Sequence, residues 1–213
     1  MKFYPAFIRL SGRRAVVIGG GPVAARKAAV LASAGAAVAV ISPEISPAIK
    51  KLADEGAVAH KQRRYRKGDL KAAFIAVAAT DDPAVNLRVA GEAEGLGILV
   101  NCVSPPEAGN FIVPSKVSRG DLTLAISTGG ASPALARRLR QDLEGFLGSG
   151  YGALLDFLEE ARSALKEKLP DQASRAKAFE ELSGPELTSV FLSSPKADAL
   201  KAARVKLSRL LAK

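Results

Sequence analysis

A glycine-rich turn between an apolar run and an alanine-rich stretch is the feature that most constrains how this chain can fold. The turn, residues 19–24, reads GGGPVA and fits the pattern G-x-G-x-x-A. It follows an apolar run over 14–18, typical of a buried strand, and begins a helical pattern over 22–34. In this setting the first glycine permits a tight turn, the second lets the backbone approach a diphosphate, and the alanine lets the helix pack on the strand. We therefore expect a dinucleotide at the helix amino terminus, in contact with Gly19, Gly21, Pro22, Val23 and Ala24.

Apolar runs and helical patterns alternate along the first half of the chain. Further strands are expected over 37–41, 57–62, 73–78 and 98–103, with helices over 47–55 and from Pro83, capped by Asp82. This alternation predicts an α/β fold, a Rossmann-like doubly wound parallel sheet with helices on both faces.

The pattern changes after the fifth strand. A β-hairpin is expected around 118–121, then a helix that begins at Pro133, and only helical patterns from 148 onward. We predict three parts: a Rossmann domain (1–113), a hairpin-plus-helix segment (114–147) and a helical C-terminal domain (148–213). The helix from Pro133 has one apolar stripe, formed by Leu135, Leu139, Leu143 and Phe146.

The end of the second strand bears on which dinucleotide is bound. An acidic residue there usually holds the ribose hydroxyls, but Ser42 occupies that position, followed by Pro43 and Glu44. No arginine follows that could hold a 2′-phosphate, so NAD is favoured over NADP. The alternative for Glu44 is a solvated residue near the start of the next helix.

Charge and composition limit the partners. The formal net charge of +10 favours an anionic partner, either a small polyanionic metabolite or, on charge alone, a nucleic acid. Aromatic residues make up only 5% of the chain, too few for base-stacking surfaces, so we expect no nucleic acid. The first eight residues do not resemble a signal peptide, and the apolar runs are far shorter than the roughly 20 residues that span a bilayer. We expect a cytoplasmic protein without membrane association.

The chain has one cysteine and one histidine, Cys102 and His60. A single cysteine excludes an internal disulfide and a cysteine cluster. Cys102 falls in an expected buried strand and His60 in the weak third strand, so we interpret both as structural and expect no metal site.

Five stretches, in order, resemble the precorrin-2 dehydrogenase family, the NAD-dependent domain of siroheme synthases. They are residues 19–28, 78–86, 101–103, 110–115 and 122–144. The resemblance implies NAD-dependent dehydrogenation of precorrin-2 to sirohydrochlorin, with iron insertion as a further activity of some members. It also implies a homodimer formed through 114–147. Precorrin-2 carries many carboxylates, which suits a basic chain.

The resemblance also implies roles for individual residues. The turns at the ends of the fourth and fifth strands add Thr80, Asn101 and Val103 to the expected cofactor site. Substrate contacts are implied for Asn110, Ser127, Thr128, Gly129 and Arg137.

One residue departs from the family pattern. The family usually has Asn-x-Val-Asp after the fifth strand, with the aspartate as a candidate acid–base group, whereas this chain has Ser104. A serine hydroxyl is a poor base near neutral pH. Three explanations stay open: positioning by Ser104 suffices, Glu107 or Asp81 takes the proton, or the chain is a non-catalytic carrier or regulator that binds NAD(H) or a tetrapyrrole. Chelatase activity is less expected than dehydrogenation.

Overall fold

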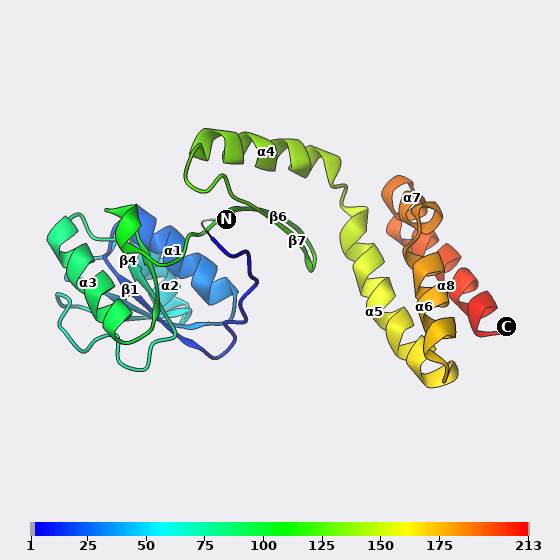
Figure 1. Ribbon diagram of the computed structural model, residues 1–213, viewed down its shortest axis with the longest axis horizontal. Coiled ribbons are helices and arrows are strands. Elements are labelled where there is room, and N and C mark those ends of the chain that lie inside the picture. Colours follow the sequence, from blue (N-terminus) through cyan, green and yellow to red (C-terminus); the bar gives the residue numbers. More distant parts are fainter. Residues whose placement is uncertain (1–2, 213) are drawn as a thin grey trace. The chain divides into compact units, whose positions relative to one another are not determined.

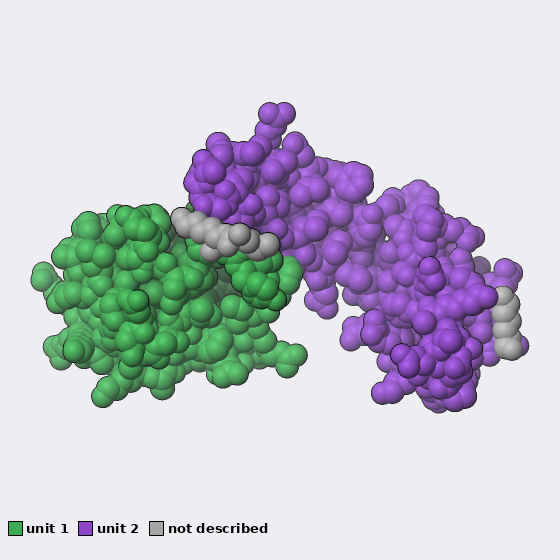
Figure 2. All heavy atoms as spheres, viewed as in Figure 1, with its two compact units in different colours: residues 1–113 green, residues 114–213 purple. Residues whose placement is uncertain are grey.

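The computed structural model describes residues 3–212, and the chain divides into two compact units, Met1–Val113 and Pro114–Lys213 (Figure 2). The predicted boundary after residue 147 lies inside the second unit, so the division into three parts stays a prediction. No helix within residues 3–212 is both long enough and apolar enough to cross a membrane.

Unit 1 is a five-stranded parallel sheet with helices (Figure 1), as the sequence predicts. The strand order is β3-β2-β1-β4-β5, so the chain moves outward from β1 and then returns to the other side of it through β4. The strands are β1 (Arg14–Ile18), β2 (Ala37–Ile41), β3 (Val58–Lys61), β4 (Ile75–Ala78) and β5 (Leu99–Cys102). The helices are α1 (Pro22–Ser33), α2 (Pro47–Asp54) and α3 (Pro83–Gly95), and a short 3₁₀ turn, η1, spans Pro106–Ala108.

The central strands are buried on both faces because their apolar side chains alternate between two hydrophobic clusters. Ala15 and Val17 of β1 lie in one cluster with residues of α1 and α2. Val16 and Ile18 lie in the other, with residues of α3. This two-sided burial is why continuous apolar runs, rather than alternating ones, marked these strands in the sequence.

The helices of unit 1 begin in two different ways. The side chains of Ser46 and Asp82 accept hydrogen bonds from the first-turn amides of α2 and α3, respectively. In contrast, the N-cap residue of α1 is Gly21, which has no side chain to accept such a bond.

An irregular segment over 62–71 is held by two carboxylates. One is Asp69, whose oxygens accept hydrogen bonds from the Arg63 guanidinium at 2.6 and 2.8 Å and from the Arg66 amide at 2.8 Å. The hydrogen bonds from Arg63 hold the pKa of the Asp69 carboxyl below its usual value.

The second carboxylate is Glu92, which reaches this segment from α3. It accepts hydrogen bonds from the amides of Gly68 and Leu70 and from the Tyr65 hydroxyl. Burial, followed by the contact with Glu92, raises the pKa of Tyr65 above its ordinary value. Glu92 therefore fixes the segment that enters β4 against the carboxyl-terminal half of α3.

The outer edge of β5 is covered by the chain that follows η1. The side-chain amide of Asn110 accepts a hydrogen bond from the Val100 amide at 2.7 Å and donates one to the Ile98 carbonyl at 3.0 Å. The main-chain amides of Asn110 and Phe111 both point to the Val100 carbonyl. These bonds take the place of a further strand.

Unit 2 contains a β-hairpin and five helices. Their bounds are β6 (Ser115–Arg119), β7 (Leu122–Ile126), α4 (Pro133–Phe146), α5 (Gly150–Lys168), α6 (Gln172–Ser183), α7 (Pro185–Ser193) and α8 (Lys196–Leu211). Arg119 joins the hairpin to α4, because its guanidinium donates to the carbonyls of Leu147 and Glu144. Helices α5–α8 share a hydrophobic cluster in which the rings of Phe157 and Phe191 lie 6.1 Å apart.

The expected core stripe on α4 is mostly exposed in the single chain. Leu135, Leu139 and Phe146 have exposed fractions of 47%, 39% and 75%, and Ala136 is the buried residue of this helix. The spacing correctly indicated an amphipathic helix, and the remaining residue of the stripe, Leu143, is half-buried.

Candidate cofactor site at the carboxyl edge of the sheet

The glycine turn follows β1 at the point where the strand order reverses, which is where α/β sheets bind ligands. Gly19 has φ of +127°, and a Cβ on it would lie 2.2 Å from the Ala79 carbonyl oxygen. The turn and the end of β4 are therefore in direct backbone contact. A residue with a side chain would separate them.

Gly20 is closed in from the other side. A Cβ there would lie 1.8 Å from the Glu44 carbonyl oxygen and 2.7 Å from Oγ of Ser42. The Gly20 carbonyl also accepts a hydrogen bond from the Ser46 amide at 2.8 Å. The turn is thus fixed to the loop between β2 and α2, an anchorage that the sequence motif did not predict.

Gly21 faces open space, in contrast to its two neighbours. Its φ is −78°, and a Cβ there would meet no heavy atom within 4 Å. Pro22 has no N–H, and the first hydrogen bond into α1 runs from Ala25 to the Gly21 carbonyl. The amides of Val23 and Ala24 are therefore first-turn donors without an intrahelical acceptor. An uncapped helix start with an unobstructed glycine fits the diphosphate of a dinucleotide.

The loop after β2 contains the three residues expected near the ribose. Ser42 is buried beneath Gly20, and its carbonyl lies 2.9 Å from Nε2 of His60. Pro43 and Glu44 are exposed. His60 is on the edge strand β3, as expected, and its contact holds this loop. The ribose contacts themselves stay a prediction.

The ends of β4 and β5 bring further predicted residues to the same edge. The Ala79 amide donates to the Ile18 carbonyl at 2.8 Å, and the Val103 amide donates to the Ala78 carbonyl at 2.9 Å. The backbone hydrogen bonds between neighbouring strands therefore continue beyond the strand ends, and they place Thr80 and Ser104 next to each other in the site. Asn101 donates its side-chain amide to the Phe111 carbonyl at 3.2 Å.

Asn86, on α3, was missed as a functional candidate. Its side chain is fully buried and links the two loops that follow β4 and β5. The Oδ1 atom accepts hydrogen bonds from the amide and hydroxyl of Thr80, and Nδ2 donates to the carbonyls of Thr80 and Ser104. A signal was present in the sequence, since Asn86 ends one of the five family-like stretches.

The candidate acid–base residues lie on exposed turns at this edge. Ser104 and Glu107 follow β5, and Asp81 follows β4, all three exposed. Cys102 is 2% exposed, and burial raises the pKa of its thiol. A backbone contact with Ser104 opposes this rise in the pKa, and the charge of Glu107 adds to it. Cys102 is thus a buried strand residue and a poor nucleophile.

The predicted substrate residues divide between the two units. Asn110 is in unit 1, where both polar atoms of its side chain bind the β5 backbone, so its amide serves the fold. The other four, Ser127, Thr128, Gly129 and Arg137, are in unit 2.

Two of these four residues build the loop before α4. Oγ of Ser127 accepts from the Gly129 amide at 3.1 Å, and Oγ1 of Thr128 accepts from the Ser132 amide at 3.1 Å. Arg137 is exposed on α4, whereas the neighbouring Arg138 and Arg140 pair with Asp142 and Glu144 one turn away. Arg137 is therefore better placed to donate hydrogen bonds to an external carboxylate, and all four contacts stay predictions.

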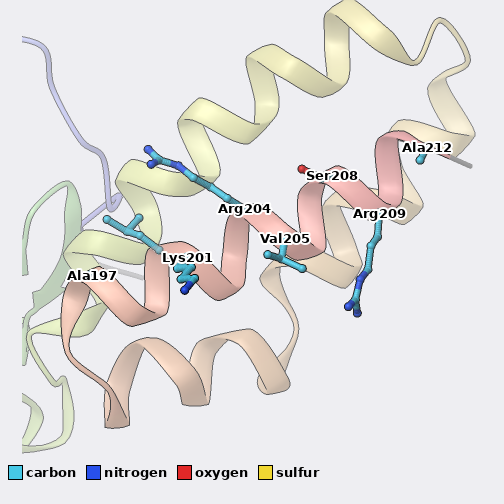
Figure 3. Close-up of a pocket in the computed structure, with 8 residues that line it drawn as sticks. Ala197, Lys201, Arg204, Val205, Ser208, Arg209 and Ala212 are labelled. Atoms are coloured by element: carbon cyan, nitrogen blue, oxygen red, sulfur yellow. The ribbon is translucent and has the colours of Figure 1, made fainter.

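A separate groove of about 800 Å³ runs along α8 in unit 2. Figure 3 shows Arg204 and Arg209 extending from α8 in different directions. Arg204 pairs with Glu160 of α5 at 3.2 Å. The groove is lined by basic and apolar side chains and by Ser208, with no acidic residue among them, which does not suit acid–base chemistry. Among residues 3–212, no group of three or more His, Cys, Asp or Glu side chains is arranged to hold a metal ion.

Comparison with known proteins agrees with this geometry. A family model described as "Putative NAD(P)-binding" matches residues 6–115, and one described as "Sirohaem biosynthesis protein central" matches residues 119–145. A solved structure, "SirC, precorrin-2 dehydrogenase", superposes with a TM-score of 0.77 and 29% identity. The match covers 95% of this chain and 100% of that one.

Two curated relatives are longer than this chain. It is 42% identical to the siroheme synthase of Chromobacterium violaceum over 186 residues, which are 87% of this chain and 40% of that protein. It is 38% identical to the siroheme synthase of Azotobacter vinelandii over 208 residues, 98% of this chain and 45% of that protein. The chain thus spans less than half the length of these relatives.

Proposed function

Because this chain belongs to the precorrin-2 dehydrogenase and siroheme synthase family, we propose that it is an NAD-dependent dehydrogenase that converts precorrin-2 to sirohydrochlorin in siroheme biosynthesis. The observation that carries the proposal is the turn after β1, where an unobstructed Gly21 precedes uncapped amides of α1 at the switch point of the sheet. This arrangement supports NAD as the cofactor, with its diphosphate at the amides of Val23 and Ala24.

The reaction removes two hydrogens from the substrate, one as a hydride and one as a proton. NAD⁺, when bound, accepts the hydride. The protein holds the substrate beside it and provides a route for the proton. In our proposal Ser104 positions the macrocycle by hydrogen bonding, and Glu107 or Asp81 receives the proton, since both are exposed carboxylates at this edge of the sheet.

The substrate is a polyanion, and the chain carries a net charge of +10. We assign the carboxylate contacts to Arg137 and to the loop Ser127–Gly129, where two consecutive glycines, Gly129 and Gly130, have positive φ. Guanidinium groups suit such contacts because they bind carboxylates in a bidentate way.

Turnover tests the proposal directly. Purified protein is incubated with precorrin-2 and NAD⁺, and NADH and sirohydrochlorin are followed together. We expect the two products in equal amounts, and a faster rate for Ser104→Asp, which supplies the carboxylate typical of the family. No NADH above background from protein that is folded and binds NAD⁺ would reject the dehydrogenase.

The second candidate is a non-catalytic protein that binds NAD(H) or a tetrapyrrole. The observation in its favour is Ser104, which replaces the family's candidate acid–base aspartate. Tight binding of NAD⁺ and precorrin-2 without any product would support this candidate. Turnover restored in Ser104→Asp would then show that the wild-type protein is inactive because it lacks this carboxylate.

We also propose a cytoplasmic homodimer. The exposed apolar side chains of Leu135, Leu139 and Phe146 form a face on α4 that a second copy would cover. The cytoplasm supplies the NAD that the reaction requires.

A further inference from the structure

Asn86 is an unusual residue for the interior of this unit. Asn86 and Ser42 are the two polar residues in the buried set of the described chain, and Asn86 has no exposed surface. An asparagine side chain can accept two hydrogen bonds and donate two. All four are made, at 2.8 and 3.0 Å to Oδ1 and at 2.9 and 3.0 Å from Nδ2.

The partners of Asn86 are three main-chain groups and the Thr80 hydroxyl, at the edge where the cofactor is expected. Three bonds go to Thr80, directly beyond the end of β4, and one goes to the carbonyl of Ser104, beyond the end of β5. Asn86 is itself fixed, because its amide donates to the Asp82 carbonyl in the first turn of α3. One side chain therefore joins the two loops, beyond the last backbone hydrogen bond between the ends of β4 and β5.

The same side chain acts on the glycine turn through Thr80. A Cβ on Gly19 would lie 3.2 Å from the Thr80 amide nitrogen, so the backbone at Thr80 forms one wall of that turn. No hydrogen bond joins Asn86 to Gly21, Val23 or Ala24 among the described residues. The side chain is thus coupled to Ser104 directly, and to the diphosphate site only through packing.

We propose that Asn86 is a positioning residue for hydride transfer, which holds Ser104 in register with the loop after β4 so that substrate and nicotinamide meet at a fixed distance. This inference rests on the proposed dehydrogenase function. A carboxylate could not replace the amide, because it lacks the two N–H donors that bind the carbonyls of Thr80 and Ser104.

The test compares two isosteric variants on the same helix. Asn86→Asp keeps the acceptors and loses the donors to Thr80 and Ser104. Glu92→Gln is the control, because Glu92 holds the unrelated segment 65–70 at the other end of α3. Both variants lose a buried contact of α3, and only one of those contacts is at the proposed site.

For Asn86→Asp we expect kcat to fall by about 10- to 100-fold, because a small misplacement of the reactants slows the reaction by such a factor. The Kd for NAD⁺, measured by calorimetry, should change less than about threefold, because the diphosphate amides lie outside the contacts of Asn86. Amide hydrogen exchange should accelerate over 80–82 and 103–104. Glu92→Gln should accelerate exchange over 65–70 and leave kcat unchanged.

Three outcomes would decide against the inference. Equal losses of kcat in both variants would show that Asn86 acts only through the stability of α3. An unchanged kcat in Asn86→Asp would show that the link to Ser104 has no role in positioning. Should Asn86→Asp not fold, Thr80→Val carries the same test, and an unchanged kcat there overturns the inference. This variant removes the hydroxyl bond to Asn86 together with the two local bonds to the Asp82 backbone. If wild-type protein itself gives no turnover, the proposed function fails, a result distinct from all three.

Discussion

At the residue scale, three consecutive glycines have three different surroundings. A Cβ would collide with the Ala79 carbonyl at Gly19 and with the Glu44 carbonyl at Gly20, whereas at Gly21 it would meet no heavy atom within 4 Å. The first two glycines are therefore requirements of the fold, and the third is free to serve a ligand. Substitution can separate these roles.

Replacement of Gly20 by alanine should destabilise unit 1. The new Cβ overlaps the Glu44 carbonyl oxygen, so both backbones must move, at a cost of about 1–3 kcal/mol in the free energy of unfolding. Urea denaturation measures this cost. Gly91→Ala is the matched control, since a Cβ there meets no atom within 4 Å and the residue lies inside α3, where alanine is favoured. Equal stability of the two variants would contradict the structure.

Replacement of Gly21 by aspartate should separate folding from binding. An aspartate caps α1 and favours its amino terminus, so the stability should stay the same or rise by about 1 kcal/mol. Its side chain and charge occupy the place of the diphosphate, so the Kd for NAD⁺ should rise at least about tenfold. Thermal denaturation and calorimetric titration measure both effects. An unchanged Kd would place the diphosphate elsewhere.

At the element scale, α3 holds an irregular segment at each end. Asn86 joins it to the loops after β4 and β5, and Glu92 joins it to the segment before β4. The helix itself was predictable, because Asp82 and Pro83 are typical of a helix start. Neither link was predictable, because a polar residue in a helix suggests a solvent-facing position, and the partners here are up to 27 residues away.

Most of unit 1 followed from the sequence for a physical reason. Strands buried on both faces give continuous apolar runs, and glycine, proline and capping residues mark where they stop. The fourth strand was predicted two residues too early, since it begins at Ile75. Ala72 has φ of +58°, a turn conformation that its side chain does not suggest. The edge at which Thr80 and Ser104 meet followed from the strand ends, whereas the side chain that joins them required the structure.

The segment 62–71 should make stability depend on acid. The pKa of Asp69 is lower in the folded state than in the unfolded chain, chiefly through the hydrogen bonds from Arg63. The stabilisation that ionised Asp69 contributes to the folded state is therefore present above about pH 4, and it is lost as the pH falls through the folded pKa. Asp69→Asn should be less stable than wild type at neutral pH, and the difference should shrink on acidification. Melting temperatures at several pH values measure it.

The control for this prediction is Asp54→Asn. Asp54 is an exposed carboxylate that pairs with Lys50 one helical turn away, and such pairs contribute little. Its melting temperature should follow that of wild type throughout. If the melting temperatures of Asp69→Asn and wild type differed by the same amount at every pH, ionised Asp69 would not be the source of the pH dependence.

At the scale of the whole molecule, each hydrophobic cluster belongs to a single unit. Two clusters lie entirely before Val113 and the third entirely after Pro114. Cooperative unfolding follows shared cores, so each unit should melt as its own body.

Calorimetry should therefore resolve two transitions. Phe157 is 1% exposed in the core of unit 2. Phe157→Ala should reduce the free energy of unfolding of unit 2 by about 3–5 kcal/mol and lower the melting temperature of that transition. Val89→Ala, in the core of unit 1, should lower only the other. The Kd for NAD⁺ should be unchanged in Phe157→Ala. A joint shift of both transitions would show that the units fold as one.

The apolar face of α4 predicts self-association. Leu139 has an exposed fraction of 39% in the single chain, and Leu139→Glu would place a charge on this face. We expect wild type to sediment as a dimer and this variant as a monomer. Val205→Glu, at an exposed apolar position on α8, is the control that should stay dimeric. A wild-type protein that sediments as a monomer would contradict the proposed dimer.

The amide of Asn110 has one more consequence. By occupying the Val100 N–H and the Ile98 carbonyl, it makes these two groups at the β5 edge unavailable to a stray peptide. Crowded or partly unfolded neighbours thus meet an edge whose hydrogen-bonding groups are partly taken, a poorer template for fibrous growth.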